Sequence, residues 1–169
     1  MEYDRYQKFR QQTYQLLGKA KDATFELMDS VMTTRNASCL AEFSLSPLFR
    51  RKWSSTYEAL EDSRPNRNKL MKRYVEEIPA SEYILLGIDH TAWGRRDAKT
   101  LKDRTYEHQA SSNNSVTVGQ GYSTIAWLPE KQGSWALPLR HERIPSYEKP
   151  ISKEAWKLKQ VSKHLKQPT

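Results

Sequence analysis

The feature that most constrains the fold is a change of hydrophobic periodicity at Glu82. Before it, apolar residues recur mostly at intervals of three and four, which is typical of amphipathic helices. After it, residues 83–88 form a short, continuous apolar run that follows Pro79 and ends at Asp89. Such a run is typical of a β-strand that is buried on both faces and ends at the acid. The sequence therefore predicts a helical region, residues 1–80, and a mixed region, residues 81–169.

Several short helices are expected in the first region. Residues 3–32 predict one amphipathic helix, or two helices with a break near Gly18. "CLAEFSLS" predicts a short helix, with Ser38 as a candidate N-cap. Pro47 suits the first turn of a further helix that ends at Asp62. Its apolar face is expected to consist of Leu48, Trp53, Tyr57 and Leu60. The bases Arg50, Arg51 and Lys52 project around this face and are candidate DNA-binding residues.

The end of the helical region resembles a helix-turn-helix. The polar turn "SRPNRN" follows the helix that contains Arg50, and "KLMKRYVEEI" predicts another helix that Pro79 stops. A pair of short helices joined by a tight turn, with basic side chains, is the pattern of a DNA-binding helix-turn-helix. Any small helical bundle gives the same pattern, so a bundle without DNA contact stays open as an alternative.

The mixed region predicts a strand, a long loop, a hairpin and a helix. Residues 90–120 are polar and weakly periodic and include "SSNNS", which is typical of a loop. "GYSTIAWLP" and "SWALPL" predict two strands around the turn "EKQG". Apolar residues between Ile151 and Leu165 predict a terminal helix, with Ser152 as a candidate N-cap. Together the two regions predict an α+β protein.

The distribution of charge favours a polyanionic partner. The net charge is +8, and residues 35–73 carry nine bases against four acids. Residues 140–169 carry eight bases against three acids, whereas the segment between these blocks is nearly neutral. Basic blocks of this kind suit nucleic acid, because neutralised phosphates release counterions. Solvated helix faces that only aid solubility are the alternative.

Several classes of protein are disfavoured. No apolar run approaches the length of about 20 residues that crosses a bilayer. One cysteine, Cys39, allows no disulfide within the chain, and the N-terminus lacks the apolar block of a secretory signal. A cytoplasmic protein without membrane contact is therefore expected. No phosphate-binding glycine loop is present and the four histidines lack metal-ligand spacing, so neither a nucleotide cofactor nor a histidine metal site is expected.

Two features of the mixed region are candidates for chemistry. An acid at the end of a central strand lies where ligand sites are usual, and Asp89 could contribute one carboxylate to a Mg²⁺ ion. The alternative is an Asp that caps the following turn. The next segment is rich in basic residues that could bind a phosphate backbone. The alternative interpretation is a solvated surface segment whose charges pair with one another. These bases are Arg95, Arg96, Lys99, Lys102 and Arg104.

Nearly the whole chain resembles the first half of a bacterial insertion-sequence transposase of the DDE type. The likeness is carried by "RNASCLAEFSLSPLFRRKWSSTYEAL", "YILLGIDHTAWGRRDAKTLKDRTYEHQ" and "VGQGYSTIAWLPEKQGSWALPLRHERI". It implies a ribonuclease H-like domain that begins with a strand, two antiparallel strands and a helix. It also implies double-stranded DNA as substrate, Mg²⁺ or Mn²⁺ as cofactor, and Asp89 as the first of three metal-binding acids.

In that family the second Asp and the Glu come later, so the resemblance implies that this chain is a truncated form, inactive alone. A homo-oligomer or a complementing chain is then the expected partner. Two alternatives stay open: a non-catalytic DNA-binding remnant that competes with the full-length enzyme, and a basic helical module unrelated to DNA.

Overall fold

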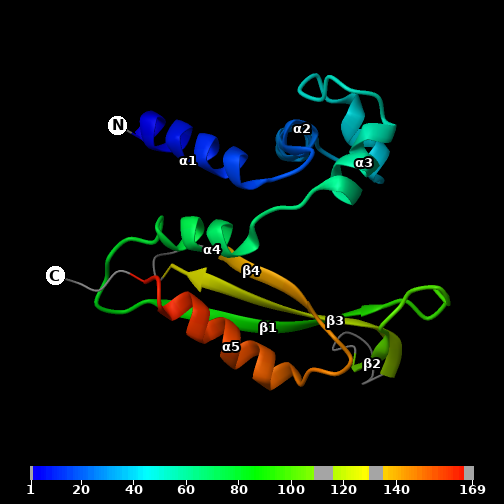
Figure 1. The fold of residues 1–169 in the computed structure, drawn as a ribbon, viewed down its shortest axis with the longest axis vertical. Coiled ribbons are helices and arrows are strands. Elements are labelled where there is room, and N and C mark those ends of the chain that lie inside the picture. The colour runs from blue at the N-terminus through cyan, green and yellow to red at the C-terminus, as the bar shows by residue number, and fades with distance from the viewer. Residues whose placement is uncertain (1, 109–115, 130–134, 166–169) are drawn as a thin grey trace. The chain divides into compact units, whose positions relative to one another are not determined.

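The protein is α+β, and it divides into two compact units, Met1–Leu70 and Met71–Thr169. The computed structural model describes residues 2–108, 116–129 and 135–165 (Figure 1). The change from one unit to the next falls within a helix, α4, whereas the sequence-based division lies at residue 80. None of the helices in these ranges has the length and the hydrophobicity that a membrane span requires.

The helices and strands follow one another in the order that Figure 1 labels. The helices are α1 (Glu2–Leu16), α2 (Lys21–Thr33), the 3₁₀ helix η1 (Leu40–Leu45), α3 (Ser54–Asp62), α4 (Arg67–Val75) and α5 (Pro150–Ser162). The strands are β1 (Leu85–Gly94), β2 (Thr105–His108), β3 (Val116–Leu128) and β4 (Leu137–Ile144).

The predicted break at Gly18 is confirmed, and it separates α1 from α2. Gly18 has a φ of +74°, a conformation that side chains disfavour. A Cβ atom at this position would lie 2.3 Å from the carbonyl oxygen of Arg64, so the chain approaches too closely for any other residue. The nearby N–H of Asn66 donates to the carbonyl of Leu16 at 2.9 Å, which satisfies one of the last carbonyls of α1.

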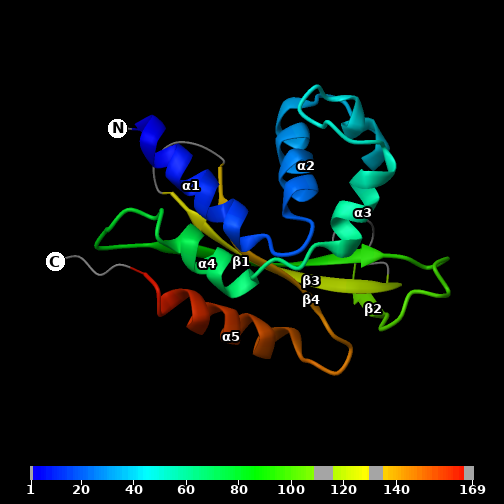
Figure 2. The ribbon, with the colours of Figure 1, turned by 45° about the horizontal axis from the view of Figure 1, so that its top comes forward.

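The helix expected to begin at Pro47 begins instead at Ser54, so that prediction is wrong. The reason is the core of the first unit, in which α2 packs against η1 and α3 (Figure 2). Phe49 is buried there with Leu27 and Ala59, and its N–H donates to the carbonyl of Ser46 in a turn. Burying Phe49 holds residues 46–53 in an irregular conformation.

The predicted apolar face of this helix is also wrong. Trp53, Tyr57 and Leu60 are exposed, and so is Leu48 in the preceding segment. The buried positions of α3 are Thr56 and Ala59. The capping prediction for Ser38 fails as well, because Cys39 precedes η1 and Ser38 instead donates to the carboxylate of Glu42.

Strand β3 is the centre of the antiparallel sheet in the second unit. Residues 121–127 of β3 pair with β1 along one edge and with β4 along the other. The start of β3, residues 116–119, pairs with β2 on the edge opposite β1, so β2 and β4 lie end to end. The predicted hairpin of β3 and β4 is confirmed, although its turn "EKQG" lies outside the described residues.

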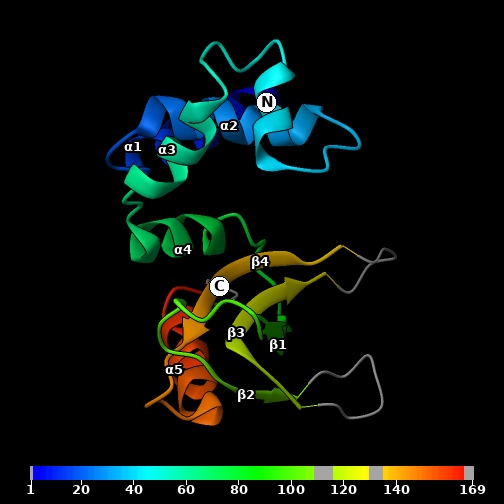
Figure 3. The same ribbon diagram turned by 90° about the vertical axis from the view of Figure 1, so that its right-hand side faces the viewer.

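Helix α5 covers one face of this sheet (Figure 3). The core of the second unit combines residues of α4, the sheet and α5: Met71, Val75, Ile78, Ile125, Leu139 and Val161. On the other face, the residues of β1 alternate outward and remain largely exposed. The strand expected to be buried on both faces is therefore covered on one face only. It was also expected to end at Asp89, but β1 continues five residues further, to Gly94.

Two further expectations in this unit are corrected. Residues 90–120, predicted as loop, contain the end of β1, all of β2 and the start of β3, although "SSNNS" lies outside the described residues. Alternation of apolar and polar residues is hard to recognise at the start of β3, because Gly119, Gln120 and Gly121 follow one another there. Helix α5 begins at Pro150 with Lys149 at the N-cap, so Ser152 lies inside the helix and does not cap it.

Lys157 is a fully buried side chain between α5 and the sheet. Its Nζ donates a hydrogen bond to the carbonyl oxygen of Ser123 in β3. Burial lowers the pKa of Lys157 to about 8, since the charged form loses its hydration; the charges of Lys153 and Arg140 act in the same direction, whereas Glu142 and Glu154 oppose it.

The buried lysine predicts a pH dependence of stability. Between pH 8 and 10.5 the unfolded chain holds a proton on Lys157 that the folded chain has released, so the free energy of unfolding rises with pH. We expect Lys157→Met to remove this rise, measured by urea denaturation across that range. Lys159→Met, an exposed lysine of the same helix, should keep it. Equal pH slopes in both variants would contradict the assignment.

Candidate nucleic-acid interface

The sheet face that α5 leaves open carries Asp89 at its centre. Strand register places Asp89 beside Thr124 and Thr124 beside His141, so the three form a row across β1, β3 and β4. Nδ1 of His141 lies 2.8 Å from Oγ1 of Thr124, and Thr91 donates to Oδ2 of Asp89 at 3.1 Å. Asp89 is exposed in the middle of a strand, so it does not cap a turn.

The described residues do not by themselves complete a metal site around Asp89. Within residues 2–108, 116–129 and 135–165, no three His, Cys, Asp or Glu side chains are grouped closely enough to hold a metal ion. Two-metal phosphoryl transfer needs several carboxylates around the ions. Asp89 supplies one, and its neighbours in the row are a hydroxyl and an imidazole.

A row of aromatic rings crosses the same open face from Trp93 of β1 through Tyr122 of β3 to His141 of β4. Trp93 and Tyr122 meet edge to face with ring centroids 6.1 Å apart. Tyr122 and His141 are stacked with centroids 5.1 Å apart and planes within 3° of parallel. The guanidinium carbon of Arg95 lies 3.8 Å from the centroid of the Trp93 ring, which is the geometry of a cation–π contact.

The loop of residues 95–104 crosses this face from β1 to β2. Gln120, on the open face beside Trp93, donates to the carbonyl of Lys102 at 3.1 Å. At the β4 side, Asp103 pairs with Arg143 at 3.1 Å and accepts the N–H of Ser146 at 2.9 Å. Hydrogen bonding from Ser146, together with the charge of Arg143, lowers the pKa of Asp103. The loop is thus fixed to the sheet at both sides.

The predicted bases of this loop have different roles. Arg104 donates to the carbonyls of Arg95 and Arg96, both at 3.2 Å, and so closes the loop. The side chains of Arg96, Lys99 and Lys102 are exposed and have no ion-pair partner in the described part of the chain. The structure therefore ties the loop that carries these cations to the face that holds Asp89: Gln120 binds the backbone of Lys102, and Arg95 lies over Trp93.

Arg50, Arg51 and Lys52 lie in the other unit, in the irregular segment before α3. Glu26 of α2 is buried and accepts two bonds from Arg50: one from its backbone N–H at 3.2 Å and one from its guanidinium at 2.7 Å. Nε of Arg51 lies 3.3 Å from the same carboxylate. Two of these three predicted DNA-binding residues are therefore tied to a buried acid, while Lys52 is exposed.

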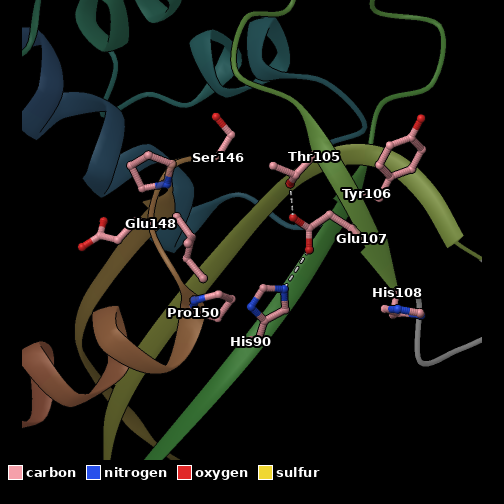
Figure 4. Close-up of a pocket in the computed structure, with 10 residues that line it drawn as sticks. His90, Thr105, Tyr106, Glu107, His108, Ser146, Glu148 and Pro150 are labelled. Atoms are coloured by element: carbon pink, nitrogen blue, oxygen red, sulfur yellow. Dashed lines mark hydrogen bonds and ion pairs between the residues drawn. The ribbon is translucent and has the colours of Figure 1, made fainter.

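The sequence reasoning missed a hydrogen-bonded pair of polar side chains on the covered face. Nε2 of His90 lies 2.9 Å from Oε2 of Glu107, and Thr105 donates to the other carboxylate oxygen (Figure 4). The pair lies over Gly121, whose missing Cβ would be 2.8 Å from both partners. A cavity of about 420 Å³ adjoins it. No sequence signal marks this pair, because its members are 17 positions apart in the chain. Only the pairing of β1 and β2 with β3 brings the two side chains together.

Comparisons of the chain with protein-family models, with curated proteins and with solved structures gave no match. The assignment of a function therefore rests on the residues and their geometry.

The buried Glu26 predicts that removing its charge destabilises the helical unit. Glu26→Gln weakens two ion pairs and leaves the guanidinium groups without their acid, so we expect a decrease of about 1–3 kcal/mol in the free energy of unfolding. Chemical denaturation measures it. Glu58→Gln, at an exposed position of α3, should change stability by less than about 0.5 kcal/mol. Equal effects of the two variants would contradict a structural role for Glu26.

Proposed function

We propose that this chain is part of a DNA transposase of the DDE type, and that the open sheet face contacts the backbone of double-stranded DNA. One observation supports the proposal: Asp89 is exposed on the open face, and the loop with the exposed cations of residues 95–104 is hydrogen-bonded to that face through Gln120. Cations that have no acidic partner gain most from phosphate, because binding releases the counterions of the DNA.

The order of elements supports the ribonuclease H-like part of the proposal. Strand β1 carries the acid, the antiparallel strands β3 and β4 follow, and α5 packs behind the sheet. This is the order that the family resemblance implies for the beginning of its catalytic domain. Strand β2 is an addition to that pattern.

In this proposal Asp89 is the first of three metal-binding acids, and residues outside 1–169 or a second chain supply the other two. Bound Mg²⁺ or Mn²⁺ would then support hydrolysis and strand transfer at the ends of the element. The role of Asp89 is to hold one carboxylate at a fixed place on a rigid strand. The helix-turn-helix-like segment of α3 and α4, with Lys52, would add a second DNA contact.

A non-catalytic DNA-binding protein that competes with a full-length transposase is the second candidate. It is favoured by the finding that the described residues contain no cluster of three metal-binding side chains. Both candidates require binding to duplex DNA. They differ in cleavage: once the other two metal-binding acids are supplied, the transposase should cut DNA and the competing protein should not.

The exposed loop cations predict a salt-dependent affinity for duplex DNA. We expect Arg96→Ala combined with Lys99→Ala to weaken binding and to reduce the slope of log K against log salt by about 1 for each phosphate that is no longer neutralised. Fluorescence anisotropy with a labelled blunt duplex measures it. Lys159→Ala combined with Lys163→Ala removes the same charge from α5 and its C-cap and should have a smaller effect. No measurable duplex binding by the unmodified chain would refute the proposal.

Asp89 is predicted to serve chemistry rather than binding. Asp89→Asn removes a negative charge beside the bound phosphates, so duplex affinity should stay equal or increase. The same anisotropy assay measures this, and the melting temperature reports on folding. A weaker affinity together with a lower melting temperature would indicate that Asp89 is a structural residue.

A further inference from the structure

We propose that the aromatic row of Trp93, Tyr122 and His141, together with Tyr106, stacks against unpaired bases of DNA. The chain would then bind single-stranded DNA, or a duplex with an unpaired end, more tightly than a continuous duplex. This inference rests on the proposed DNA binding and adds the class of DNA that the open face takes.

The outer rings are exposed on the open face, and the Arg95 guanidinium lies over one face of the Trp93 ring. Trp93 is 43% exposed and Tyr106 is 81% exposed, and His141 is exposed at the other end of the row. Strand register puts Tyr106 opposite Val118 and Trp93 opposite Gln120, two positions apart on β3, so both rings project from the same face. In Figure 4, Tyr106 points away from the side of β2 that carries Glu107.

Tyr122, on the central strand β3, contacts the rings of Trp93 and His141 and holds them in place. Its ring is half-buried between Trp93 and His141, and its hydroxyl donates to Oε1 of Gln120 at 3.1 Å. Because the same Gln120 side chain holds Lys102, the rings and the loop are joined in one hydrogen-bonded arrangement. The outer rings therefore keep their positions without a ligand.

The cations beside the rings favour the binding of nucleic acid over the binding of an apolar protein surface. Arg95 lies on Trp93, and the exposed side chains of Arg96, Lys99 and Lys102 follow in the loop. An apolar protein surface would leave these cations without partners, which opposes its binding. A nucleic-acid strand offers phosphates to the cations and π-faces to the rings, the combination found in single-strand binding sites.

The geometry also separates unpaired from paired bases. In a continuous duplex each base is covered above and below by its neighbours, so it has no free face for Trp93 or Tyr106. An unpaired base has such a face, and its stacking on an aromatic side chain contributes about 1–3 kcal/mol. The expected preference for unpaired DNA is therefore about 5- to 150-fold per stacked base.

The test compares three labelled probes with the full chain by fluorescence anisotropy. The probes are a thymidine oligonucleotide, a blunt duplex and the same duplex with an unpaired 3′ end. We expect the first and third to bind more tightly than the second. Trp93→Ala should reduce that preference about 5- to 150-fold, whereas Trp93→Phe should keep most of it.

Two further variants keep the test decisive. Trp135→Ala removes a ring that is 84% exposed and lies outside the row, so it should preserve the preference. Tyr106→Ala removes a ring with little packing and should reduce the preference even if Trp93→Ala destabilises the sheet.

The outcomes distinguish this inference from the function on which it rests. Equal affinity for blunt and unpaired probes, or an unchanged preference in both Trp93→Ala and Tyr106→Ala, overturns the stacking site and leaves duplex binding intact. A chain that binds none of the three probes overturns both.

Discussion

Both faces of the second unit depend on the pairing of β3 along its two edges. Strands β1 and β4 satisfy its backbone over residues 121–127, and β2 satisfies its start. A central strand without these partners would leave buried N–H and C=O groups unpaired, at a high cost in free energy. Because β3 is fixed, its alternating side chains build a core on one side and a polar, aromatic surface on the other.

The two faces use charge in opposite ways. On the covered face, charged groups are buried only with partners: Lys157 with the carbonyl of Ser123, Glu107 with His90 and Thr105, and Arg140 with Glu142. On the open face, the loop cations stay exposed to solvent and can accept a ligand. The same chain thus separates charges that hold the fold from charges that are free for binding.

The sequence predicted the kinds of elements better than their limits. The break at Gly18, the strand around Ile88, the β3–β4 hairpin and the terminal helix all follow from local patterns of apolar spacing. The start of α3 could not be predicted, because it depends on the burial of Phe49 and on Glu26, which is 24 residues away from the Arg50 backbone it binds. Local propensity does not contain such long-range contacts.

The candidate site was predictable only in part for the same reason. Asp89 and the basic segment stand out by composition, but their common face depends on the register of β1 with β3 and on the path of the loop over Gln120. The aromatic row joins residues from three strands, so no single stretch of sequence contains it.

The anchoring of residues 95–104 has a consequence for the thermodynamics of recognition. Both ends of the loop continue into strands that pair with β3, and Arg104, Asp103 and Gln120 fix its interior. The entropy of closing and ordering this loop is therefore given up when the protein folds, not when a ligand arrives. An incoming polyanion would meet a preorganised backbone, and only the tips of the basic side chains would still have to be immobilised.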